Sequence, residues 1–195
     1  MDLILGSHNK GKLREYKALL ADAPFTLRLL DEVGLAAFDV QETGETIEAN
    51  ALLKARAYAN ACHMPVLADD TGLEVDALDG GPGVYSARYG SSDRERCQRL
   101  LSELFNVPQE ARSARFVCVI AVARPNNGQT ITARGVVEGR IAFSMGQGSE
   151  GFGYDRIFIP DGYDVTWNAI SLAEKNHISH RGRAARALLP LLSHF

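Results

Sequence analysis

The sequence has few cysteines, and their spacing suits neither a metal site nor a disulfide framework. The 195 residues include only Cys62, Cys97 and Cys118, with no CxxC pair among them. Structural zinc sites and disulfide-rich domains need closely spaced or paired cysteines. Isolated cysteines are typical of a reducing compartment, where thiols stay free. We therefore expect a cytoplasmic protein.

Long hydrophobic runs and a strong charge of one sign are also missing. The longest apolar run, 116–123, is far shorter than the roughly 20 residues of a membrane helix. The N-terminal residues lack the basic and apolar segments of a signal peptide, so we expect none. The net charge is −3, from 24 acidic and 21 basic residues, and gives no basic surface for nucleic acid. We expect neither a membrane nor a nucleic-acid partner.

The hydrophobic pattern of the first third of the chain predicts strands alternating with helices. An apolar run at 3–5 ends at Gly6 and precedes a helical pattern that begins near Leu13. A second helix is expected over about 46–62, and a buried strand at 66–68 follows it. This alternation is typical of an α/β fold.

The remaining segments predict a loop, a hairpin and a final helix. The stretch 79–83 has three glycines and a proline and should be a loop. Strands at 115–124 and 129–138 flank a hairpin turn, and a last helix should pack through 184–192. We therefore predict one α/β domain over 1–195, with a mixed β-sheet flanked by helices.

The first candidate site is the loop between the first strand and the first helix, residues 7–12 (SHNKGK). A helix N-terminus presents unpaired N–H groups and a partial positive charge, which suits phosphate. Ser7 and Asn9 add short polar side chains, and Lys12 adds a charge. The spacing of a Walker A loop is absent, and a capped helix with solvated lysines explains the same residues.

Acidic and basic residues around the second helix and the next strand form two more candidates. Asn50 and Lys54 are four residues apart, so they share one helix face, where they can hold phosphate or form a polar surface. Glu42, just before this helix, can reach a metal. Asp69 and Asp70 follow the buried strand, where α/β sheets place ligands. One can bind Mg²⁺ and the other can accept a proton from water, although Asp-Asp-Thr-Gly also forms Asx turns.

The last candidates suit recognition of a flat base. In segment 151–155 (GFGYD), glycines let the backbone approach a ligand, an aromatic ring can stack on it, and Asp155 can accept from ring nitrogens. Lys175, His180 and Arg181 can donate to a carbonyl oxygen on a base. A glycine-rich turn carrying core aromatics, and a histidine at a helix start, are the simpler alternatives.

Six ordered blocks resemble the inosine triphosphate pyrophosphatase family, the RdgB-type dITP/XTP pyrophosphatases that act on non-canonical purine nucleoside triphosphates. They run almost from end to end: SHNKGK at 7–12 with Glu15, ETGETIEANALLKA at 42–55, ADDTGL at 68–73, GPGVYSAR at 81–88, GFGYD at 151–155 and EKNHISHRG at 174–182. Several motifs in one order at compatible spacing are far more specific than any one of them.

The resemblance implies the fold, the reaction and the site. The fold would be an elongated mixed sheet in two lobes with a central substrate cleft, and the protein a homodimer. The reaction would be Mg²⁺-dependent hydrolysis of ITP, dITP or XTP to the monophosphate and pyrophosphate, which cleanses the nucleotide pool. Asp70 matches the proton acceptor and a magnesium ligand, with Asp69 in support and Glu42 as another ligand. The implied substrate-binding residues are Ser7, His8, Asn9, Lys10, Gly11, Lys12 and Lys54 for the triphosphate, Thr71, and Phe152, Gly153, Tyr154, Asp155, Lys175, His180 and Arg181 for the purine.

Two positions depart from the family pattern. Gln41 replaces the first of two acids, and Ala49 replaces the Glu that often precedes Asn50. A metal-shell carboxylate is therefore either missing or supplied by Glu42 or Glu48, although Glu48 points about 100° away from position 49 on an ideal helix.

Three other functions remain open from the sequence. A pyrophosphatase for modified pyrimidines would share the phosphate residues without the Ser-His-Arg purine motif. A nucleotide sensor would bind without turnover, as a missing metal ligand would allow. An RNA-binding protein would need a basic face with stacking aromatics, which the charge does not favour.

Overall fold

The computed structural model describes residues 2–126, 128–193 and 195. Its helices are α1 (Lys10–Leu19), α2 (Ile47–Cys62), α3 (Asp93–Glu103), α4 (Leu172–Ile178) and α5 (His180–Leu192). Its strands are β1 (Asp2–Leu5), β2 (Thr26–Leu29), β3 (Val66–Val75), β4 (Pro82–Gly83), β5 (Ser113–Ala123), β6 (Thr130–Ile141) and β7 (Phe158–Pro160). In the described part of the chain, every helix is too short or too polar to span a bilayer.

The chain divides into two compact units. Unit 1 comprises Met1–Asp70, Cys118–Gly135 and Arg181–Phe195, and unit 2 comprises Thr71–Val117 and Val136–His180. Strands β3, β5 and β6 contribute residues to both units. The single domain over 1–195 and the central substrate cleft stay predictions.

The strands pair as a mixed sheet. Among the described residues, seven strands pair in the order β2-β1-β3-β5-β6-β7, and β4 pairs with β3. Strand β1 is parallel to β2 and β3, whereas β4 and β7 are antiparallel to β3 and β6. The predicted α/β class with a mixed sheet and flanking helices is confirmed. The expectation of a loop throughout 79–83 is wrong at its end, because Pro82–Gly83 pairs with the edge of β3.

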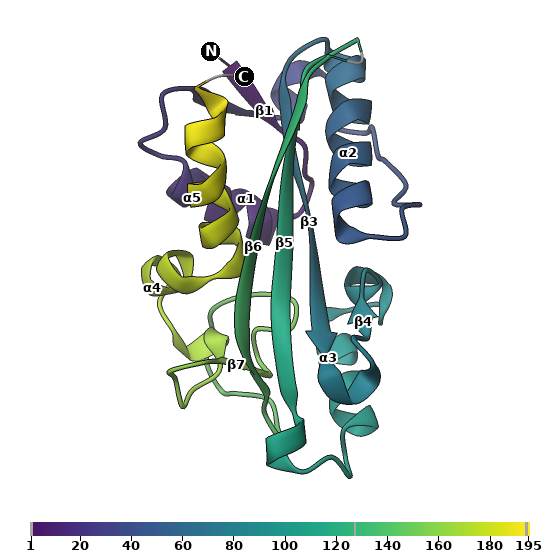
Figure 1. Ribbon diagram of the computed structural model, residues 1–195, viewed down its shortest axis with the longest axis vertical. Coiled ribbons are helices and arrows are strands. Elements are labelled where there is room, and N and C mark those ends of the chain that lie inside the picture. Colours follow the sequence, from purple (N-terminus) through teal and green to yellow (C-terminus); the bar gives the residue numbers. More distant parts are fainter. Residues whose placement is uncertain (1, 127, 194) are drawn as a thin grey trace. The chain divides into compact units, whose positions relative to one another are not determined.

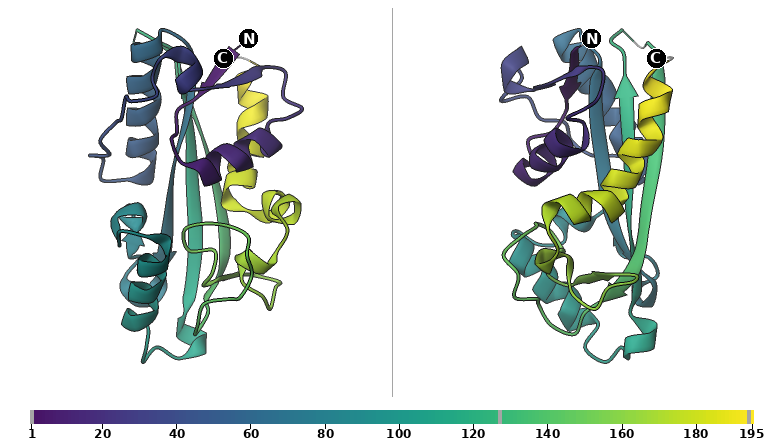
Figure 2. Two further views of the ribbon diagram at one scale, coloured as in Figure 1. Left: turned by 180° about the vertical axis from the view of Figure 1, so that it is seen from behind. Right: turned by 90° about the vertical axis from the view of Figure 1, so that its left-hand side faces the viewer.

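In unit 1, helices cover both faces of the strands. Helices α1 and α5 lie on one face of β3 and β5, and α2 lies on the other (Figure 1 and Figure 2). Alternate residues such as Leu3, Leu5 and Leu67 pack with Leu188 of α5 in one buried cluster. The same alternation along β3 decides which helix each acidic residue meets.

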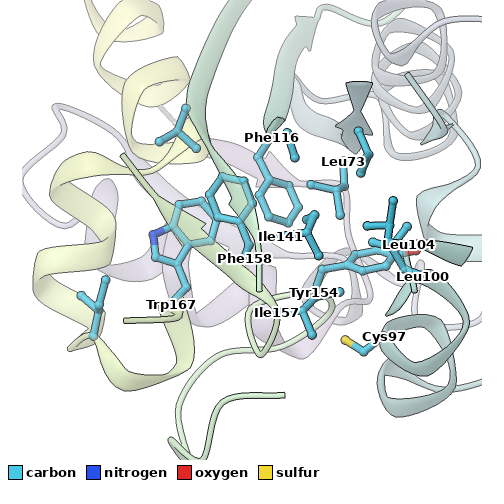
Figure 3. Close-up of a cluster of buried hydrophobic side chains, with 14 residues drawn as sticks. Leu73, Cys97, Leu100, Leu104, Phe116, Ile141, Tyr154, Ile157, Phe158 and Trp167 are labelled. Atoms are coloured by element: carbon cyan, nitrogen blue, oxygen red, sulfur yellow. The ribbon is translucent and has the colours of Figure 1, made fainter. Parts of the chain in front are cut away.

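The core of unit 2 is built on aromatic side chains. Phe116, Phe158 and Trp167 lie together at its centre (Figure 3). The Phe116 and Trp167 rings are stacked with centroids 5.1 Å apart, and Phe158 meets Phe116 edge to face at 4.8 Å. Aromatic pairs of this kind add to the apolar area they bury. Trp167 also stacks on His180, with centroids 5.4 Å apart, so this cluster contacts a residue predicted to recognise the purine.

Side-chain caps set where the helices begin. Asn9, Thr46, Ser92 and Ser171 accept from backbone N–H groups in the first turns of α1, α2, α3 and α4. Each cap satisfies a donor that the helix leaves without an internal partner. Ser171 and Glu174 have the spacing of a capping box, and Ser171 does cap α4. Glu174, three residues later, accepts from the Tyr163 hydroxyl.

Candidate active site

The loop before α1 presents a helix N-terminus beside the acidic pair of β3. Asn9 Oδ1 accepts from Lys12 N at 3.1 Å, and Ser7 Oγ accepts from Asn9 N at 3.2 Å. Lys12 Nζ lies 3.0 Å from Asp69 Oδ1 and donates to the Asp69 carbonyl at 3.2 Å. The loop therefore has a fixed conformation, with its lysine already directed at the acidic pair.

The structure gives positions for the other residues of this loop, and their role is untested. His8 Nε2 donates to the Phe38 carbonyl at 2.9 Å. Lys10 is exposed at the start of α1, and Gly11 lies in its first turn. Phosphate binding by the 7–12 loop stays a prediction.

Lys54 joins Glu42 to Asp70. Its ammonium is bonded to Glu42 Oε1 and lies 3.5 Å from Asp70 Oδ1. Burial alone would lower the pKa of Lys54, but the nearby carboxylates, Asp70 first, overcome this and raise it. Lys54 thus stays charged between two carboxylates.

Asp70 has the character of a base. Burial raises its pKa above the ordinary value, Lys54 and Lys12 oppose that rise, and Glu42 adds to it. A carboxylate with a raised pKa binds a proton more readily than an exposed one. A perturbed carboxylate beside lysines is a recurrent feature of catalytic sites.

Asp69 has the opposite character, although it is the neighbouring residue. Arg181 Nη2 lies 3.2 Å from Asp69 Oδ2, and the same guanidinium is bonded to Glu15. Burial alone would raise the pKa of Asp69, but Lys12, Arg181 and Lys54 hold it well below the ordinary range. Asp69 is therefore a permanently ionised partner of these cations and does not accept a proton near neutral pH.

The two acids differ because they lie inside a strand. The sequence placed Asp69 and Asp70 at the end of a short strand, but β3 continues to Val75. Successive side chains of a strand point to opposite faces, so Asp69 meets α1 and α5 while Asp70 meets α2. The predicted position at the carboxyl end of a strand applies to β1 instead. The parallel pairing of β1 with β3 ends at Leu67, just before the two acids.

The loop that carries Glu42 is held by α2. Asn50 is fully buried, and its Oδ1 accepts from Gly44 N at 2.7 Å. Glu48 Oε1 accepts from the Thr132 hydroxyl at 3.1 Å. Glu42 is therefore the carboxylate that meets Lys54 beside Asp70, and Asn50 positions its loop.

The residues of unit 1 fit a magnesium ion shared with a substrate. Asp70 Oδ2 is buried and accepts no hydrogen bond from any described residue. Across those residues, no three acidic, histidine or cysteine side chains converge as a complete metal cage. Mg²⁺ commonly takes one or two carboxylates and completes its shell with phosphate oxygens and water. Asp70, with Glu42 bonded to the same lysine, would supply such a partial shell.

Unit 2 brings together residues predicted to recognise the purine. Lys175 Nζ lies 2.5 Å from Asp155 Oδ2, and the same oxygen accepts from Phe152 N at 2.7 Å. The ammonium also lies 5.0 Å from the centroid of the Phe152 ring. His180 stacks on Phe116 with centroids 4.8 Å apart. Four predicted residues, Phe152, Asp155, Lys175 and His180, thus lie on connected parts of one unit.

Other predicted purine residues have structural partners. Tyr154 is buried in the core, and its hydroxyl donates to the Ser86 carbonyl at 2.8 Å. Gly153 N donates to Asp93 Oδ2 at 2.7 Å. Arg181 donates to Glu15 and Asp69 in unit 1, and Thr71 follows Asp70 in β3. Substrate contact by these residues stays a prediction.

Sequence reasoning assigned no role to Glu15 and did not single out Asn168. Glu15 is 1% exposed and bonded to Arg181. Glu15 lies three residues after Lys12 in the same helix, and this spacing indicates that both side chains lie on one helix face. Asn168 is equally buried, but no motif or period marks it.

Known proteins resemble this chain over nearly its whole length. A HAM1 protein from Coxiella burnetii has a solved structure that matches with a TM-score of 0.88 and 39% identity over 100% of both chains. A dITP/XTP pyrophosphatase of Symbiobacterium thermophilum is 49% identical, covering 97% of this chain and 95% of the relative. One of Bacillus subtilis is 43% identical, covering 98% and 96%.

Relatives named dITP/XTP pyrophosphatase thus share this sequence over nearly its whole length. The sequence matches the Ham1 family over residues 3–191, and the chain belongs to that family. The resemblance drawn from the six motifs is confirmed.

Proposed function

We propose that this chain hydrolyses non-canonical purine nucleoside triphosphates, dITP, ITP and XTP, to the monophosphate and pyrophosphate. Relatives over nearly the whole chain carry the name dITP/XTP pyrophosphatase. The structural observation that supports the reaction is Asp70, a buried carboxylate with a raised pKa, held beside Lys54 and Glu42. By removing such nucleotides the protein prevents their incorporation into DNA and RNA.

Asp70 would act as the general base. Its raised pKa makes it a better proton acceptor than an ordinary aspartate, while Lys54 opposes that rise and favours the ionised form. The proton it accepts belongs to the water that attacks the α-phosphorus and displaces pyrophosphate. Asp69 supports this role by holding Lys12 and Arg181.

Positive groups of unit 1 would hold the triphosphate. Lys12, Lys54 and the N–H groups at the start of α1 can neutralise charge on the phosphate oxygens. Because these groups are already fixed by Asp69, Asp70 and the Asn9 cap, they need little rearrangement when charge develops. Ser7, His8 and Lys10 complete the proposed phosphate loop.

We also propose that Asp70 and Glu42 hold Mg²⁺. The ion would stabilise negative charge on the bound phosphates. The buried Oδ2 of Asp70 supports this assignment, since an oxygen of this kind suits a hard cation. On the family resemblance we propose a homodimer, and on the three free cysteines a cytoplasmic location.

Unit 2 would select the base. Lys175, fixed by Asp155, can donate to the 6-oxo group of inosine or xanthine. The 6-amino group of adenine is itself a donor, so it would face the Lys175 ammonium without forming a hydrogen bond. Sites built on specific hydrogen bonds discriminate strongly, because a wrong ligand leaves buried groups unpaired.

A substrate panel tests the function. With Mg²⁺, purified protein should release pyrophosphate from dITP and XTP and little from dGTP or dUTP, measured as separate yields of pyrophosphate and orthophosphate. Orthophosphate alone would contradict cleavage between the α- and β-phosphates. Binding without product would indicate a sensor, and cleavage of dUTP alone would contradict the purine assignment.

The pH profile tests the role of Asp70. Since its pKa is raised, the acid limb of kcat/KM should lie above the ordinary aspartate value of about 3.9. Activity is lost as pH falls through this limb, because the protonated carboxyl cannot accept a proton. In Lys54→Met the limb should move to higher pH, since a charge that opposes the rise is removed. A limb that stays in place in this variant would argue against Asp70 as the titrating base.

A further inference from the structure

Asn168 lies outside every motif of the sequence and is only 1% exposed. Its side-chain Nδ2 donates to the carbonyls of Gly146 at 3.1 Å and Gly148 at 2.6 Å. Its backbone carbonyl accepts from Glu150 N at 3.3 Å, and its backbone N–H donates to the Asp155 carbonyl at 3.2 Å. One residue therefore ties four points of the segment 146–155.

Thr166 completes the hydrogen bonding of this amide. The Thr166 hydroxyl donates to Asn168 Oδ1 at 2.6 Å. The Gly146 and Gly148 carbonyls can only accept, so they determine which end of the amide carries the nitrogen, and the hydroxyl donates to the remaining oxygen. The two N–H donors of Asn168 are thereby directed at the glycine carbonyls.

The glycines of the segment allow the backbone to approach this pair closely. A Cβ on Gly148 would lie 1.9 Å from the Asn168 carbonyl oxygen, and one on Gly146 would lie 2.0 Å from Thr166 Oγ1. Such distances are far inside van der Waals contact. The two glycines are therefore required by this contact, and not by a turn.

The tied segment leads directly into the residues proposed to meet the base. The carboxylate of Asp155 holds Phe152 N and Lys175 Nζ, while its carbonyl is held by Asn168. Displacement of Asn168 would move Asp155, and through it both the stacking ring and the ammonium. A shift of a fraction of an ångström matters for selection, because the hydrogen bonds to a base are directional.

We propose that Asn168 is a positioning residue that sets the discrimination of unit 2 for 6-oxopurines. The proposal rests on the function proposed above. Asn168 touches neither the base nor the phosphates in this account. It acts through Asp155 and the 146–151 backbone. Its substitution should therefore change the affinity and selectivity for the base and leave kcat nearly unchanged.

The direct test is Asn168→Asp, which keeps the shape of the side chain but places a carboxylate oxygen against two carbonyls. The KM for dITP should rise about tenfold with kcat changed less than about threefold, and the dITP to dATP ratio of kcat/KM should fall about tenfold. Gly148→Ala should reproduce this pattern with Asn168 intact. Asn106→Asp, the same change at an exposed position of unit 2, should leave every value at that of the wild type.

Two measurements without turnover keep this test separate from the proposed function. The dissociation constant of inosine monophosphate should rise about tenfold in Asn168→Asp, and backbone amides of 146–155 should exchange hydrogen faster. Trp167, the one tryptophan in the sequence and the neighbour of Asn168, reports by its fluorescence whether the core stays intact. Unchanged affinity and selectivity in both variants would overturn the proposal, as would an equal loss of kcat for every triphosphate. If the wild type binds inosine monophosphate but releases no pyrophosphate, the proposed function fails while the binding comparison still decides the role of Asn168.

Discussion

Asp70→Asn should lose at least about 10²- to 10⁴-fold in kcat, the contribution of a well-placed general base. The substitution keeps the size and shape of the side chain but removes its ability to accept the proton of the attacking water. It also removes a charge from the proposed Mg²⁺ shell, so the loss can exceed this range. Steady-state release of pyrophosphate from dITP measures the effect.

The same substitution should leave the ligand-free protein as stable as the wild type or more stable. Burial raises the pKa of Asp70 in the folded state, so the folded protein binds this proton more tightly than the unfolded chain does. Ionisation of Asp70 near neutral pH therefore opposes folding, and the neutral amide removes this cost. Loss of a partner for Lys54 offsets part of the gain.

Thermal unfolding separates this explanation from simple damage to the fold. Asp22→Asn, the same change at an exposed position of unit 1, should alter neither activity nor melting temperature. An Asp70→Asn protein with near-normal turnover would refute the assignment of the base. A markedly lower melting temperature would refute the account of its burial.

Arg181→Met should destabilise the protein by about 3–5 kcal/mol, the usual cost of leaving buried charges without their partner. Arg181 is 1% exposed and is bonded to Glu15 and Asp69, which are equally buried. Methionine fills much of the volume but removes the guanidinium from Glu15 and leaves Asp69 with one fewer cation beside Lys12. In a chain of this length the melting temperature should fall by about 10 °C.

The triple variant Glu15→Gln, Asp69→Asn, Arg181→Met should recover much of this loss. It removes the uncompensated charges together, so the penalty of the single substitution is no longer present. Arg183→Met, on the exposed side of the same helix, is the matched control and should change the melting temperature little. A triple variant no more stable than Arg181→Met would contradict the buried-charge explanation.

The pH dependence of stability checks the same network. The pKa of Asp69 is depressed in the folded protein, so its contribution to stability is fully present above the unfolded value of about 3.9. That contribution is lost as pH falls below this value towards the folded pKa. In Asp69→Asn, the loss of stability in acid should be shallower.

Much of the local structure was predictable because it depends on neighbours in the chain. The 3.6-residue period of α2, the apolar run of β1 and the β-rich runs on either side of 125–128 predicted elements that the structure contains, whereas Asn127 of the predicted turn lies outside the described residues. The cap at Ser171 followed from spacing alone. The motifs also identified the family, because their order and content can be read from the sequence without knowledge of the fold.

The sequence by itself thus determined the family, the α/β class and the types of charged residue available for chemistry. Only the tertiary structure decided what those residues do, because their partners come from distant parts of the chain. Asp69-Asp70-Thr71-Gly72 has the composition of a turn, yet β3 continues through it, from its pairing with β1 up to Leu67 to its pairing with β4 from Leu73. Strand geometry then directs Asp69 to Arg181, 112 residues away, and Asp70 to Lys54. Asn168 was invisible for the same reason, since hydrogen bonds to a loop 20 and 22 residues earlier leave no period in the sequence.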